Sequence, residues 1–162
     1  SVFSTIVRSW INNGPVKNDR LEVMLQALYE NDIEMFEEQL NDFVVNTLSY
    51  YDTSGRTPEK VYQAFLLGML ASSGAYEVSS NREAGLGRYD ILMRPKDLSR
   101  QGFIMELKRL RASETVEKAL ASALKQIEDK NYAATLRVAG VTAILRMAIT
   151  FDGKRVWVKT VE

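Results

Sequence analysis

The chain has 162 residues, 46% hydrophobic and 26% charged, a balance typical of one soluble globular domain. It contains neither cysteine nor histidine, which excludes disulfides, zinc–thiolate centres and histidine bases and leaves only oxygen ligands, suited to magnesium, manganese or calcium. The 21 basic and 21 acidic residues cancel, so binding of nucleic acid would require a local basic patch.

The N-terminal third is predicted to be helical. A short helix at residues 4–11 should stop at the breaker cluster Asn-Asn-Gly-Pro at 12–15. Asp19 is expected to cap a second helix and Asp32 a third, each followed by apolar residues at helical spacing. We expect residues 1–50 to form a helical lead-in packed on the same domain as a core at 51–162.

The core is predicted to begin with a loop at 51–56 and a helix. Thr57 suits the cap, Pro58 the first helical position and Glu59 the first turn, and the helix should end near 73–74.

After this helix the apolar pattern changes to the spacing of strands. The expected elements are a short strand at 76–80, a turn at 81–87, strands at 88–94 and 102–109 joined by a hairpin loop around 95–97, one helix at 113–134 capped by Ser113, and strands at 141–151 and 155–161. The order α-β-β-β-α-β-β predicts an α/β fold, with a central mixed sheet flanked by helices.

Two of these strands carry acidic residues in apolar surroundings. The first contains Asp90 and the second Glu106 and Lys108. Residues two apart in a strand point to the same side, so Glu106 and Lys108 can meet Asp90 of a neighbouring strand. Two carboxylates can hold a divalent cation that polarises a phosphate and activates water, and a lysine can orient that water or stabilise developing charge. The trio therefore suits phosphodiester hydrolysis.

A structural interpretation stays open for the same residues. Glu106 and Lys108 can form an ion pair on a solvated strand face, with Asp90 at a strand end, because Glu-x-Lys alone is a short motif.

The segments GRYDIL and FIMELK, followed by a helix, resemble the PD-(D/E)XK nuclease superfamily. Together with YQAFLLGML, ALKQIEDKNYA and FDGKRVWV, they are most similar to the nuclease-like domain that follows an AAA-ATPase-like domain in many bacterial proteins. The match covers about residues 57–159. It implies a restriction-endonuclease-like α-β-β-β-α-β core and a possible ATPase-like partner domain in a longer chain.

The resemblance also implies roles for single residues. Asp90 and Glu106 would be metal ligands and Lys108 the catalytic lysine. Glu59 would be the helix acid that binds a second metal or a water, and Gln126 would orient Lys108 or a phosphate. Ordinary interpretations remain beside these: Glu59 suits a helix start electrostatically, and Gln126 suits a helix surface.

Several basic residues are candidates for contacts with nucleic acid. They can track phosphates beside the site or simply form a solvated surface. They are Arg88, Arg109, Arg111, Lys125 and Lys130.

The predicted function is hydrolysis of DNA by a Mg²⁺- or Mn²⁺-dependent nuclease, with RNA as another possible substrate. The alternative is a catalytically weak or inactive module of the same fold that binds nucleic acid or a protein partner. Gln63 favours this alternative, since many relatives have His at that position. No apolar run is long enough to cross a membrane, and we expect a cytoplasmic protein.

Overall fold

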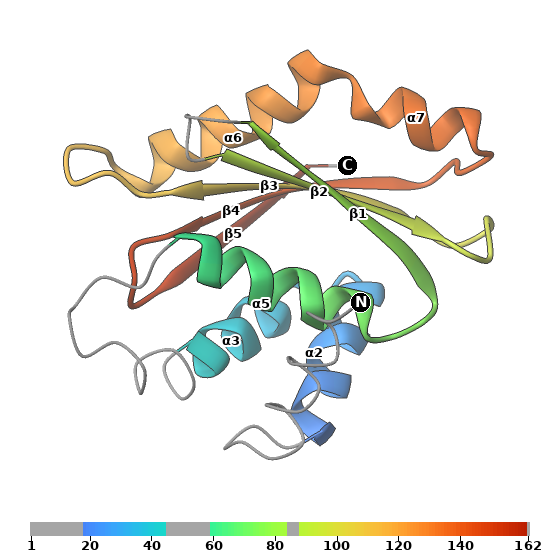
Figure 1. Ribbon diagram of the computed structural model, residues 1–162, viewed down its shortest axis with the longest axis horizontal. Coiled ribbons are helices and arrows are strands. Elements are labelled where there is room, and N and C mark those ends of the chain that lie inside the picture. The colour runs from blue at the N-terminus through green and yellow to red at the C-terminus, as the bar shows by residue number, and fades with distance from the viewer. Residues whose placement is uncertain (1–17, 45–58, 84–87, 162) are drawn as a thin grey trace. The chain divides into compact units, whose positions relative to one another are not determined.

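A computed structural model describes residues 18–44, 59–83 and 88–161 (Figure 1). Within these ranges, the side chains of 18–19, 59–61, 81–83 and 88–90 lie outside the description. The predicted helix at 4–11, the loop at 51–56 and the cap Thr57 also lie outside the described residues. The chain divides into two compact units, residues 1–73 with 152–156, and residues 74–151 with 157–162.

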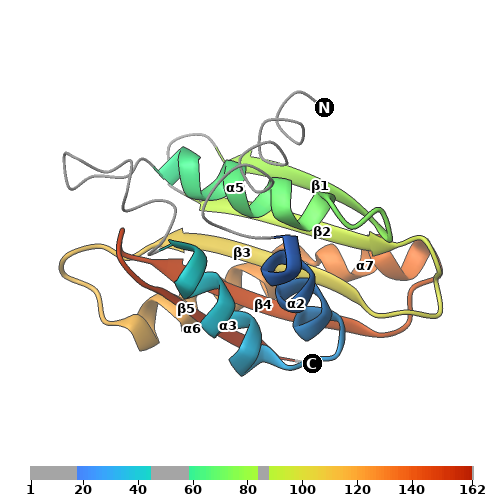
Figure 2. The same ribbon diagram turned by 90° about the horizontal axis from the view of Figure 1, so that it is seen from below.

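The first unit is helical and contains α2 (Asn18–Tyr29), α3 (Ile33–Phe43) and α5 (Glu59–Ala71). Helices α2 and α3 pack against each other (Figure 2). The Asp32 side chain accepts a hydrogen bond from the backbone N–H of Met35 at 3.2 Å, which confirms the predicted cap of α3. The predicted cap of α2 is wrong, because the helix begins at Asn18 and includes Asp19.

The second unit is built on a five-stranded sheet in the order β1-β2-β3-β4-β5. Its strands are β1 (Tyr76–Glu83), β2 (Arg88–Pro95), β3 (Gly102–Arg109), β4 (Ile144–Phe151) and β5 (Val156–Val161). Strands β1, β2 and β3 pair antiparallel, whereas β3 and β4 pair parallel. A parallel pair needs a long crossover, and here α6 (Val116–Lys130) and α7 (Tyr132–Val138) supply it. The predicted α/β fold with a mixed sheet is confirmed.

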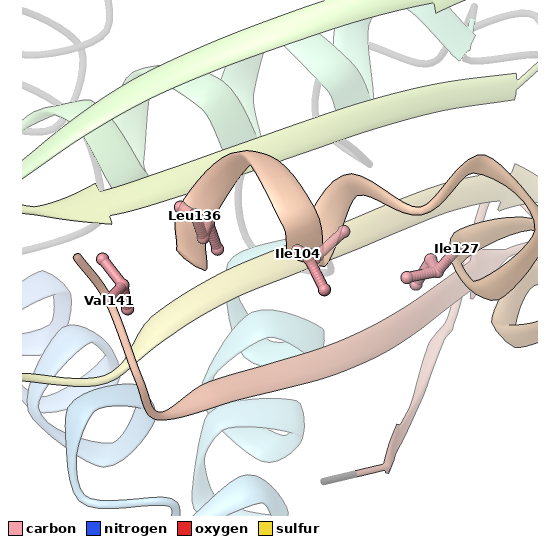
Figure 3. Close-up of a cluster of buried hydrophobic side chains, with 5 residues drawn as sticks. Ile104, Ile127, Leu136 and Val141 are labelled. Carbon is pink, nitrogen blue, oxygen red and sulfur yellow. The ribbon is translucent and has the colours of Figure 1, made fainter. Parts of the chain in front are cut away.

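Helices α6 and α7 cover one face of this sheet (Figure 1). Ile104 of β3 packs there against Ile127, Leu136 and Val141, as Figure 3 shows. Nearer the start of α6, Leu120 and Ala123 pack on Ala148 of β4. The face of β3 that carries Ile104 is therefore the face that meets α6 and α7.

The alternate residues of β3 are buried as well. Phe103, Met105 and Leu107 are each at most 2% exposed. A strand buried on both faces is expected to be a near-continuous apolar run, and β3 fits this pattern apart from Glu106 and Lys108. These two ionisable residues are the exceptions that need an explanation.

The structure corrects several predicted boundaries. The single helix expected at 113–134 is divided at Asn131, whose left-handed conformation (φ 52°) separates α6 from α7. Its cap is Thr115 rather than Ser113, because Thr115 accepts from the Lys118 N–H at 3.3 Å. Strand β1 extends to Glu83 because it pairs with the whole length of β2, so the predicted turn at 81–87 begins too early.

None of the helices in the described ranges is long and apolar enough to cross a bilayer.

Candidate active site

The register of the sheet brings the three predicted site positions together. Asp90 of β2 lies directly opposite Glu106 of β3, and Arg88 lies opposite Lys108. Opposite positions in an antiparallel pair share one face of the sheet. Position 92, two residues after Asp90, packs against the cluster around Ile104, so positions 90, 106 and 108 belong to the face that carries α6. The side chains of Asp90 and Arg88 lie outside the described residues.

Glu106 is a buried carboxylate without a hydrogen-bond partner in the described part of the chain. The residue is 1% exposed, and both Oε1 and Oε2 are buried and unpaired. Its neighbour in the register on β4 is Ala148, which offers no side-chain donor. An unpaired buried carboxylate is costly. Its two free oxygens fit a hard divalent cation, with Asp90 as the position that can supply a second carboxylate.

Lys108 is also buried, at 7% exposure, and its charge is paired. Its Nζ donates to Oε2 of Glu114 at 2.8 Å. Its backbone carbonyl accepts a hydrogen bond from Oγ1 of Thr150, on the parallel strand β4, at 2.7 Å. The open interpretation of Glu106 and Lys108 as an ion pair on a solvated face is therefore wrong, since both are buried and the partner of Lys108 is Glu114.

Glu114 was not among the predicted site residues. It immediately precedes the Thr115 cap of α6, and its pKa is lowered because the Lys108 ammonium donates a hydrogen bond to it. Arg111 adds a weaker attraction, with Nε at 3.9 Å from Oε1. A carboxylate near the start of a helix is common, so nothing in the sequence distinguished Glu114 from the exposed Glu117 one turn away.

The structure describes the side chain of Gln126 but not that of Glu59. Gln126 lies on α6, and its Oε1 is buried without a hydrogen-bond partner among the described residues. An orphaned amide oxygen can face a substrate or an ion. Glu59 is the first residue of α5, but its side chain is outside the described residues, so its role stays a prediction. The described side chains contain no cluster of three acidic ligands.

The candidate basic residues lie mostly in contact with solvent. Arg109, Arg111 and Lys125 are exposed, and the Lys130 Nζ lies 5.9 Å from the centre of the Tyr132 ring. Arg109 and Arg111 follow Lys108 within three residues, so a basic segment adjoins the end of β3 that carries Lys108.

A comparison with curated proteins found no significant match. The family model described as PD-(D/E)XK nuclease superfamily matches residues 57–161, which include Asp90, Glu106 and Lys108. Because this match covers more than half of the chain, the protein belongs to the PD-(D/E)XK nuclease superfamily.

Proposed function

We propose that this chain is a Mg²⁺- or Mn²⁺-dependent nuclease that hydrolyses phosphodiester bonds of DNA. Membership of the superfamily indicates phosphodiester hydrolysis and binding of nucleic acid in general. The observation that carries the specific proposal is Glu106, whose two buried oxygens have no hydrogen-bond partner among the described residues and which lies opposite Asp90 in the register.

In this proposal, Glu106 and Asp90 hold the cation. A buried carboxylate without a hydrogen-bond donor from the protein is strongly stabilised when a bound cation replaces the hydration that it lost on burial. A bound Mg²⁺ or Mn²⁺ supplies Lewis-acid stabilisation of phosphate charge and a more acidic water.

Lys108 has a separate role, because an ammonium has no lone pair for a cation. Its Nζ uses one of three N–H donors on Glu114, which leaves two for an attacking water or a phosphate oxygen. Low exposure strengthens such a charge-assisted contact, since little water competes for it. The side-chain amide of Gln126 on α6 is proposed to orient Lys108 or a phosphate, and Glu59 is proposed to bind a water or a second cation.

The substrate is proposed to reach the site along the basic segment. Arg109 and Arg111 are exposed next to the Lys108 end of β3, and Lys125 is exposed on α6. Exposed guanidinium and ammonium groups bind phosphates without base selection, so we expect weak dependence on sequence. Arg88 and Lys130 are proposed to assist, and the association with an ATPase-like domain stays a prediction.

The deciding experiment is a cleavage assay on linear, circular and single-stranded DNA and on RNA, with Mn²⁺, Mg²⁺ or EDTA. We expect cation-dependent cleavage of DNA that is lost in Asp90→Ala. The matched control is Asp97→Ala, because Asp97 is an exposed carboxylate in the loop after β2. Cleavage that persists in Asp90→Ala would place the chemistry elsewhere.

The same assay tests the alternative of a binding module. That alternative predicts no cleavage under any cation, together with nucleic-acid affinity that falls when Arg109 and Arg111 are replaced. Binding measured by fluorescence anisotropy at several salt concentrations separates the two outcomes.

A further inference from the structure

We propose that Glu114 is a positioning residue that holds the Lys108 ammonium and keeps it from neutralising Glu106. This inference rests on the proposed function, because it assigns Glu114 to the same site. Glu114 acts through Lys108 and touches neither cation nor substrate in this scheme.

The first step concerns which of two carboxylates, Glu106 or Glu114, forms an ion pair with Lys108. Glu106 and Lys108 are two residues apart on the same face of β3, a separation of about 6–7 Å along the strand that a lysine side chain can span. Neither oxygen of Glu106 has a hydrogen-bond partner among the described residues. Nevertheless, the Lys108 Nζ lies 2.8 Å from Glu114, and no ion pair joins it to Glu106 among the described contacts. Among the described residues, the Glu106 carboxylate thus stays free of Lys108.

The second step concerns why the Lys108 ammonium pairs with Glu114 rather than with Glu106. Its backbone N–H donates to the Arg111 carbonyl at 3.0 Å, which closes a turn directly before α6. The next residue, Thr115, is fixed as the helix cap by its bond to the Lys118 N–H. The backbone of Glu114 is therefore anchored on both sides, so little backbone freedom is lost when its side chain binds Lys108. It also lies near the positive end of the helix and beside Arg111.

The third step concerns what the contact does for the site. A single acceptor fixes the direction of one N–H, and the other two donors then point in limited directions. Without Glu114, the flexible ammonium is free to turn toward Glu106, a buried carboxylate on the same face of β3 with no hydrogen-bond partner among the described residues. An ammonium there would compete with a cation for the same oxygens. Glu114 therefore supports both the cation site and the orientation of Lys108.

Two measurements test the inference. In the cation-free protein, a double-mutant cycle combines Glu114→Gln with Lys108→Met and follows urea unfolding. We expect non-additive shifts in the midpoint, with the double variant less affected than the sum of the two single variants. This arm is independent of catalysis. Strictly additive shifts would show that the pair does not exist in solution, and would overturn the proposal.

The second measurement is Mn²⁺ binding by calorimetry, accompanied by kinetics of DNA cleavage. Glu114→Gln is expected to weaken Mn²⁺ binding and to lower kcat by about 10–100-fold each, as outer-sphere partners of metal sites typically do, while KM for DNA stays unchanged. The matched control is Glu117→Gln, which removes an exposed carboxylate from the first turn of the same helix and should change neither quantity.

The outcomes of the two measurements separate this inference from the proposed function. Wild-type protein that binds Mn²⁺ but cleaves nothing refutes the nuclease, while loss of Mn²⁺ affinity in Glu114→Gln still supports the positioning role. Unchanged Mn²⁺ affinity and kcat in Glu114→Gln overturn the positioning role, whatever the wild type does.

Discussion

Replacing Glu106 by Met should stabilise the cation-free protein and abolish its response to cations. Methionine is unbranched and of similar length, and it carries no strong hydrogen-bonding atoms. Glu106 is 1% exposed, and no described residue bonds to its oxygens. Its removal therefore leaves no described partner unpaired, which is unusual for a buried charged residue.

The magnitude follows from that environment. An unsatisfied buried polar group costs about 1–3 kcal/mol of folding free energy, and more when charged. For a chain of this length, each kcal/mol corresponds to about 2–4 °C in Tm. We therefore expect Glu106→Met to raise Tm in EDTA by roughly 2–12 °C. Wild-type protein should in turn gain about 2.7 kcal/mol when free Mn²⁺ reaches 100 times its Kd. The variant should gain nothing.

The assay is thermal unfolding of both proteins in EDTA and in Mn²⁺. The difference in Tm between Glu106→Met and wild type should shrink or change sign when the cation is added. Glu114→Gln provides the contrast, because Glu114 forms an ion pair with the buried Lys108 and the substitution breaks that pair; this variant should be destabilised. A Glu106→Met protein that is less stable than wild type in EDTA, or equally stabilised by Mn²⁺, would refute the reasoning.

Three further predictions concern other parts of the same unit. Lys108→Met should lower kcat about 100- to 1000-fold while Mn²⁺ binding by calorimetry persists, and Lys96→Met, at an exposed position in the loop after β2, should retain most activity. The pKa of Glu114 is lowered because Lys108 donates a hydrogen bond to its carboxylate. This interaction stabilises the fold above the ordinary glutamate pKa of ~4.3, and the stabilisation is lost as pH falls through the lowered pKa. Unfolding midpoints between pH 3 and 6 should therefore depend less on pH in Glu114→Gln than in wild type. Gly102→Ala should destabilise by about 1–3 kcal/mol in urea unfolding, because a Cβ there would lie 3.1 Å from both Leu136 Cδ1 and Val141 Cγ1 and 3.3 Å from the Met93 carbonyl; an unchanged midpoint would mean that these neighbours move aside freely.

Much of the sheet was predictable because local signals agree with the tertiary fold. The polar segment after Pro95 separates two apolar strands, so β2 and β3 form a hairpin. The position of Asp90 opposite Glu106 follows from the length of that hairpin. The helix after β3 predicts a crossover, and the crossover requires β4 to be parallel to β3.

Helix ends were predicted less well, because competing signals lie close together. Ser113 and Thr115 are both good caps, and only the hydrogen bond to Lys118 distinguishes them. Asn131 is compatible with a helix, but its side chain also tolerates the left-handed conformation that ends α6. Packing of Ala133 and Leu136 into the cluster around Ile104 then fixes α7 as a separate helix.

The sequence by itself determined that two carboxylates and a lysine occupy neighbouring strands, because the two-residue period of a strand and the hairpin between β2 and β3 are local properties. Only the tertiary structure decided how the charges are paired. The loop between β3 and α6 brings Glu114 back onto Lys108, while Glu106 stays buried without a partner in the described part of the chain. The physical reason is that pairing of buried charges depends on rotamers, loop path and exclusion of water, and none of these is encoded in the spacing of the residues.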